Sequence, residues 1–191
     1  MKTKLGLPVA ALALGLCGCV VPALQPLFAD KDVIPYPALV GTWTQQEGEK
    51  EQGRWTFETE QDRYRLRQRD ESGREATFIV AAGKLGGQLF LDFVPENPAP
   101  REGLNDFVAV SLLPGHVFVK AWETNNGLML VAMDVEWLDR HLQENPRAIA
   151  HVIQDNRAVL TASTGDLQQF FRKHAADTNA FKNPIRLVRK K

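Results

Sequence analysis

From Leu39 onward, apolar and polar residues alternate with a period of two, which is typical of antiparallel strands with one buried face. In one such segment Trp55, Phe57 and Thr59 share a face, and polar residues lie between them. Turn-forming pairs such as Asn126-Gly127 separate the segments, whereas residues 95–106 contain three prolines and predict a longer, irregular loop. We expect about eight strands in an up-and-down meander, at residues 41–44, 55–59, 63–67, 78–82, 89–93, 107–112, 117–122 and 128–133.

After residue 133 the apolar positions follow a helical spacing instead. Asp134 is a candidate N-cap for a helix with one apolar side, formed by Trp137, Leu138, His141 and Leu142. A short hairpin around residues 155–156, a second helix from residue 163 or 164 and a closing strand at 185–188 complete the pattern. The predicted fold class is therefore mainly β (α+β): an antiparallel meander with two C-terminal helices and a short extra hairpin.

The first residues have a different composition. Lys2 and Lys4 precede an apolar run from Leu5 to Leu16, and small residues follow. This order of charged, apolar and small residues is the layout of a secretory signal peptide. The run holds about a dozen residues, whereas a helix that spans a bilayer needs about 20. We therefore expect an exported protein.

The end of this leader, Leu16-Cys17-Gly18-Cys19, resembles the lipobox of bacterial lipoproteins. The resemblance implies cleavage after Gly18, a diacylglyceryl thioether on Cys19 and acylation of the new amino group. Several fatty chains anchor a protein firmly, because each buried CH₂ contributes about 0.8 kcal/mol. Val20 stands where an Asp would favour retention in the inner membrane, so the resemblance implies the outer membrane, with the domain facing the periplasm. A signal peptide cut elsewhere and a buried apolar N-terminus are the alternatives.

Composition supports a single domain behind this leader. Of the two cysteines, one would leave with the leader and the other would carry lipid, so the mature domain would hold no disulfide and no thiol ligand or nucleophile. The leader takes two of the 23 basic residues and none of the 23 acidic ones, which leaves a net charge of −2. A charge this close to neutral gives no electrostatic reason to expect nucleic acid as a partner.

The predicted organisation has three parts. Residues 1–18 form the signal peptide, residues 19–38 the lipidated cysteine and a tether, and residues 39–191 one globular domain. The tether is predicted because four prolines break any helix there and favour extended chain: Pro22, Pro26, Pro35 and Pro37.

The segment Gly41-Thr42-Trp43, at the start of the first expected strand, resembles the Gly-x-Trp opening of the lipocalin-like (calycin) superfamily. The resemblance implies an antiparallel barrel whose floor is closed by Trp43. It also implies that an arginine from the far end of the chain, Arg186 or Arg189, packs on that ring. A barrel of about eight strands can enclose one small ligand.

Patterns of catalytic residues are missing from the sequence. It contains no Gly-x-Ser-x-Gly, no phosphate-binding or dinucleotide-binding glycine pattern and no His-Glu-x-x-His. No two of the four histidines stand at metal-ligand spacing, and His141 and His174 lie on apolar helix faces, where burial is the simplest interpretation. We expect no catalytic residue, no metal and no cofactor, and therefore a protein that is not an enzyme.

Four arginines on one side of a single expected strand are the most unusual polar feature: Arg63, Arg65, Arg67 and Arg69, about 6.6–6.8 Å apart. If residues 61–62 form a two-residue turn, Glu60 opposes Arg63 and Glu58 opposes Arg65, whereas Arg67 faces Thr56 and Arg69 faces Arg54. The row is then either a salt-bridged outer wall, a surface for an anionic partner or an anion-binding barrel interior.

Two hypotheses for function follow. The first is a membrane-anchored barrel that binds a small apolar or amphipathic ligand, and it predicts a hollow interior. The second is a structural or interaction lipoprotein of the envelope, and it predicts a filled interior and a partner surface. Both describe a non-enzymatic envelope lipoprotein with a lipid anchor as its membrane contact.

Overall fold

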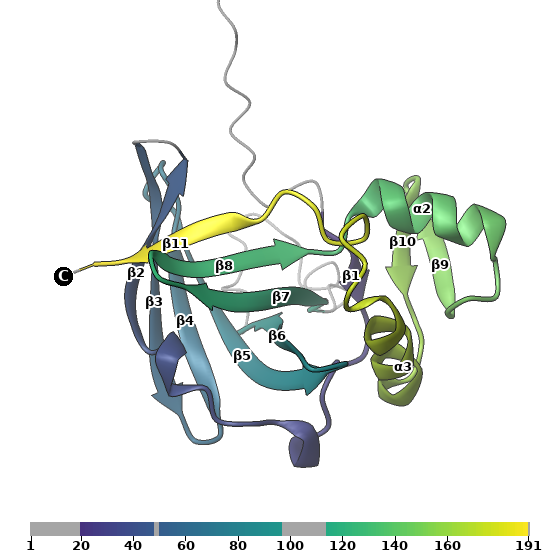
Figure 1. Cartoon of the computed structure of the whole chain (residues 1–191), viewed down its shortest axis with the longest axis horizontal. Coiled ribbons are helices and arrows are strands. Elements are labelled where there is room, and N and C mark those ends of the chain that lie inside the picture. Colours follow the sequence, from purple (N-terminus) through teal and green to yellow (C-terminus); the bar gives the residue numbers. More distant parts are fainter. Residues whose placement is uncertain (1–19, 48–49, 97–113, 191) are drawn as a thin grey trace, which may run out of the picture.

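The computed structural model describes residues 20–47, 50–96 and 114–190. Eight antiparallel strands form a closed barrel, with a smaller lobe of helices and short strands against one side (Figure 1). The ring runs β6-β5-β4-β3-β2-β11-β8-β7 and closes between β6 and β7. The predicted fold class is confirmed. The ring strands are β2 (Gly41–Glu47), β3 (Lys50–Glu60), β4 (Arg63–Arg69), β5 (Glu75–Leu85), β6 (Gln88–Pro95), β7 (His116–Thr124), β8 (Gly127–Ala132) and β11 (Ile185–Arg189).

The closing strand predicted near the C-terminus completes the ring. β11 inserts between β2 and β8, with Leu187 opposite Gln45 on one side and Leu128 on the other. The barrel is thus closed by joining the end of the chain to its first long strand. The strand predicted at residues 107–112, and most of the loop predicted at 95–106, lie outside the described residues.

Alternation along the strands fills the barrel interior with large side chains. Trp55, Phe57 and Leu66 are 4%, 1% and 1% exposed, and they pack in one cluster with Leu91 and Leu130. Trp55 stacks on Phe57 and meets the ring of Phe93 edge-on, at centroid distances of 6.4 Å. In the described part of the chain, the inward-facing positions therefore form a packed core.

The lobe covers the outer face of the barrel wall around β6, so this wall is apolar on both sides. It contains α2 (Val135–Glu144), α3 (Thr164–His174) and the hairpin of β9 (His151–Gln154) and β10 (Arg157–Leu160). Phe90, on the outer face of β6, meets the rings of Phe171 and Phe181 at 5.9 and 5.7 Å. Both helices and the hairpin were predicted. Asp134 caps α2 as expected, because its side chain accepts a hydrogen bond from Trp137 N.

The tether predicted for residues 20–38 is wrong for the part of it that the structure describes. Ala23, Leu27 and Phe28 are 0%, 0% and 3% exposed. The two-residue strand β1 (Pro22–Ala23) pairs with both β7 and β10, and 3-10 turns at Asp30–Asp32 and Pro37–Leu39 lead into β2. Phe28 packs so closely on Gly83 that a Cβ there would lie 2.3 Å from its ring. Prolines prevent a helix but do not prevent an extended chain from burying the apolar residues between them.

Candidate functional site

Trp43 and Arg189 meet at one end of the barrel. The guanidinium carbon of Arg189 lies 4.3 Å from the centroid of the Trp43 ring, a cation–π distance. Its Nη1 and Nη2 donate hydrogen bonds to Val40 O and Ala38 O, each at 2.8 Å, and Trp43 Nε1 donates to Leu39 O at 2.8 Å. Arg189 therefore joins the last strand to the turn before β2 and covers the tryptophan, which is the packing that the calycin resemblance implies.

Gly41 makes room for this contact. Its φ is +129°, a conformation that favours glycine, and a Cβ there would lie 2.5 Å from Arg189 Nη1. The spacing from Gly41 to Trp43 thus has a direct physical cause in this chain, since the glycine leaves space for the guanidinium that covers the tryptophan.

Arg186 was the other candidate to pack on the ring of Trp43, but its side chain has a different contact. Its Nη2 donates to Gln46 Oε1 at 2.8 Å. It lines an open hollow with Trp43, Glu123 and Asn126, among others. This hollow lies outside the barrel core and mixes both signs of charge with amides, so it is an open polar surface rather than an enclosed apolar pocket.

The arginine row has the register that the sequence predicts. Arg63 opposes Glu60, Arg65 opposes Glu58, Arg67 opposes Thr56 and Arg69 opposes Arg54. The ion pairs, however, join diagonal neighbours: Arg65 meets Glu60 at 2.9 Å and Arg67 meets Glu58 at 2.6 Å. Diagonal partners in an antiparallel pair lie within reach of long side chains.

Carboxylates from other segments complete the pairing of the row. Arg63 contacts Asp30 at 2.6 Å, Arg65 contacts Glu96 at 2.8 Å and Arg69 contacts Glu75 at 3.8 Å. Each arginine of the row thus has at least one carboxylate within 4 Å. The row lies on the outside of the barrel, and this arrangement favours a salt-bridged outer wall over a free cationic surface.

A buried carboxylate ties the first described residues to the barrel. Asp92, on the outer face of β6, is 3% exposed. Its Oδ2 accepts a hydrogen bond from Leu27 N at 2.8 Å, and its Oδ1 lies 2.8 Å from Nδ1 of His116. Sequence reasoning missed this site, because residue 27 was assigned to the tether and alternation alone gave no outer-face role to an acid in β6.

The structure also brings together two histidines that the sequence separates by 33 positions. His141 on α2 and His174 on α3 have ring centroids 4.9 Å apart, and both pack against Trp137 at 4.9 Å. Their Nε2 atoms are buried without a hydrogen-bond partner among the described residues. Burial, followed by the nearby charges of His141 and Lys173, lowers the pKa of His174 below 6.5.

Metal binding finds no support in the described ranges, which contain no cluster of three or more His, Cys, Asp or Glu side chains with suitable spacing. Within the same ranges, no helix has both the length and the apolar character needed to cross a bilayer. Cys19 lies outside the described residues.

A scan against family models finds no match for this chain, and searches of the curated proteins and of the solved structures find none either.

Proposed function

We propose that this protein is a non-enzymatic lipoprotein of the cell envelope, anchored by lipid on Cys19, that acts by binding a macromolecular partner on its outer surface. The anchor is supported by the sequence Leu16-Cys17-Gly18-Cys19 behind a charged and apolar leader. Val20 after the cysteine supports the outer membrane as the destination, with the domain facing the periplasm.

The observation that carries the proposal is the packing of the barrel interior. Side chains such as Trp55, Phe57 and Leu91 occupy the space in which a lipocalin-like barrel would hold a ligand. Small-molecule sites are concave and enclose most of their ligand, whereas the hollows near Arg186 and near His141 are open. This supports the interaction hypothesis over the hypothesis of a small apolar ligand.

Two measurements on the full-length protein test the proposal. Intact mass should give the lipid-modified chain that starts at Cys19, and Cys19→Ser should abolish both the modification and the cleavage. Native mass spectrometry after gentle extraction should give no small non-covalent adduct and a stoichiometric protein partner. A discrete small molecule that is lost on denaturation would contradict the interaction hypothesis and favour the ligand-binding one.

A further inference from the structure

The chain enters the domain beside the hairpin of β9 and β10. β1 pairs in parallel with β10, with Ala23 opposite Leu160. Because the strands are parallel, the chain before Pro22 leads toward the turn at residues 155–156. The pairing itself is confined to β1, and extrapolating its register by two residues would bring Val20 level with Arg157. The strand order β1-β10-β9 places β9 two strand spacings, about 10 Å, to the side of β1.

The free edge of this hairpin is apolar. β9 ends the sheet, and no strand covers its outer edge in the described part of the chain. Val152 and Ile153 are 49% and 61% exposed, and they point to opposite faces of the strand. Leu24, the other large hydrophobic residue that is exposed among the described ones, lies beyond the Leu160 end of β10 and away from the turn.

Lipidation of Cys19 would bring a bilayer to this edge. Adjacent Cα atoms are about 3.8 Å apart, so the fatty chains on Cys19 would begin one peptide unit from Val20. The headgroup region on each side of a bilayer is about 5–7 Å deep. Because residues 20–28 pack against the rest of the domain instead of projecting from it, this stretch does not act as a spacer between the domain and the membrane.

We infer that the edge of the β9–β10 hairpin contacts the phospholipid surface beside the anchor, with Val152 and Ile153 in the headgroup and acyl-chain boundary. This inference rests on the lipid anchor of the proposed function. Arg157, an exposed residue at the turn end of β10, lies where it can meet lipid phosphates. A second copy of the chain is a poorer occupant, because a four-residue strand with two apolar side chains falls far short of the roughly 1,200 Å² that a stable interface buries.

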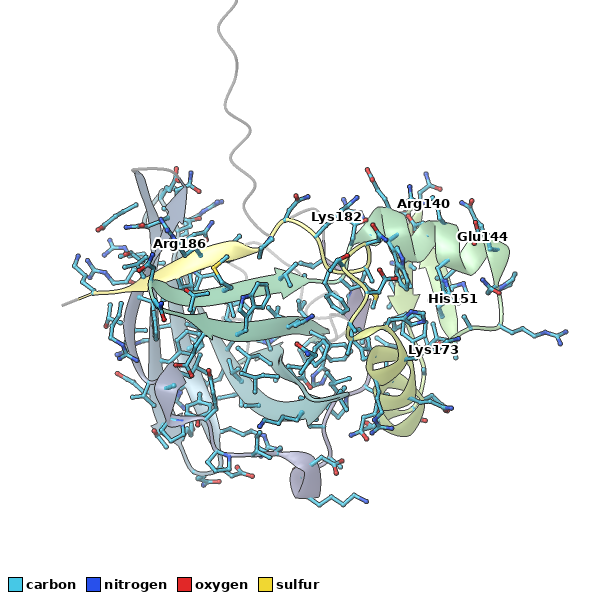
Figure 2. All side chains as sticks on the ribbon, viewed as in Figure 1. Arg140, Glu144, His151, Lys173, Lys182 and Arg186 are labelled. Carbon is cyan, nitrogen blue, oxygen red and sulfur yellow. The ribbon has the colours of Figure 1, made fainter. Side chains whose placement is uncertain are left out.

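This contact gives the domain a defined orientation. β7 starts at His116, which pairs with Ala23, and ends at Thr124, about 26 Å further along at 3.3 Å per residue. Arg186, at that other end, lies on the opposite side of the molecule from His151, the first residue of β9 (Figure 2). The hollow near Arg186 would therefore face away from the bilayer, toward a periplasmic partner.

The test uses single cysteines in the full-length lipoprotein, purified in detergent and reconstituted into vesicles of phosphatidylethanolamine and phosphatidylglycerol. Val152→Cys and Ile153→Cys each carry a polarity-sensitive thiol fluorophore, and Asn125→Cys, exposed in the turn after β7, is the matched control. The expected result is blue-shifted emission at 152 and 153, with quenching by lipids spin-labelled in their acyl chains. The label at 125 should keep the emission of an aqueous site and escape quenching.

The wild-type chain separates this inference from the proposed function. In the lipoprotein, Cys17 is removed with the signal peptide, and the thiol of Cys19 is blocked by the diacylglyceryl group. The wild-type protein should therefore take no thiol label. If it takes the label and its intact mass lacks lipid, the anchor proposal fails, and the inference fails with it. If it takes no label but 152 and 153 are as unquenched as 125, the membrane contact is overturned while the anchor stands.

Discussion

Asp92 should be one of the most costly polar side chains to remove, because it holds the first described residues against the barrel. Each of its two hydrogen bonds involves a charged acceptor and contributes about 1.5–3 kcal/mol. Asp92→Ala also leaves the N–H of Leu27, which is 0% exposed, without a partner. Relief from burying a carboxylate offsets part of this loss. We expect a net loss of about 2–4 kcal/mol in the free energy of unfolding.

Urea unfolding followed by tryptophan fluorescence measures this loss, and amide hydrogen exchange locates it. Exchange protection should fall most in residues 20–28. Asp92→Asn, which keeps one acceptor oxygen and the shape, should lose less than the alanine variant. Glu71→Ala, an exposed acid in the turn after β4, is the control and should stay within about 0.5 kcal/mol of wild type. The reasoning is refuted if Asp92→Ala matches Glu71→Ala in stability and leaves the protection of residues 20–28 unchanged.

Three further predictions concern other residues. Arg189→Ala should lower the free energy of unfolding in urea by about 1–2 kcal/mol, because it removes a cation–π contact and two hydrogen bonds at an exposed site. Arg186→Ala should lower it less, and equal losses would contradict the role of Arg189. Because the pKa of His174 is lowered in the fold, the contribution of the neutral ring to stability is complete above pH 6.5 and is lost as the pH falls below that value. His174→Phe should reduce this acid sensitivity when the free energy of unfolding is measured against pH. An unchanged pH profile would contradict this prediction. Val20→Asp should move the lipoprotein from outer-membrane to inner-membrane fractions on a density gradient, and an unchanged distribution would contradict the sorting role of Val20.

The strands and their register could be predicted because each depends on local patterns. Alternation identified the barrel strands among the described residues, and a two-residue turn at 61–62 fixed which residues oppose each other on β3 and β4. The candidate N-cap Asp134 gave the start of the first helix, and the start of the second was predicted at residue 163 or 164, where the structure has Ser163 as the N-cap. In each case the deciding interaction joins residues a few positions apart, so a single sequence contains the necessary information.

The missed features depend on contacts between distant segments. Asp30 pairs with Arg63, and Leu27 bonds Asp92 across 65 positions, so neither partner could be recognised from its neighbours. Proline content led to the prediction of a tether at residues 20–38, although Leu27 and Phe28 have the apolar character of buried residues. The pairing of His141 with His174 likewise depends on how α2 packs against α3, which helical periodicity alone does not determine.

The packing of this chain limits where a partner can bind. The barrel interior is filled, and the lobe buries the outer face of the strands around β6. If the β9 edge rests on the bilayer, two regions of the described residues are candidates for the partner surface: the salt-bridged wall of β3 and β4, and the end of the barrel with Trp43 and Arg186. The wall holds its arginines in ion pairs, whereas the hollow at that end exposes the side-chain amides of Asn125 and Asn126 in the turn after β7. Photo-crosslinking probes placed at Asn126 and at Arg67 in living cells should therefore capture a partner preferentially from Asn126, and capture mainly from Arg67 would assign the partner surface to the wall instead.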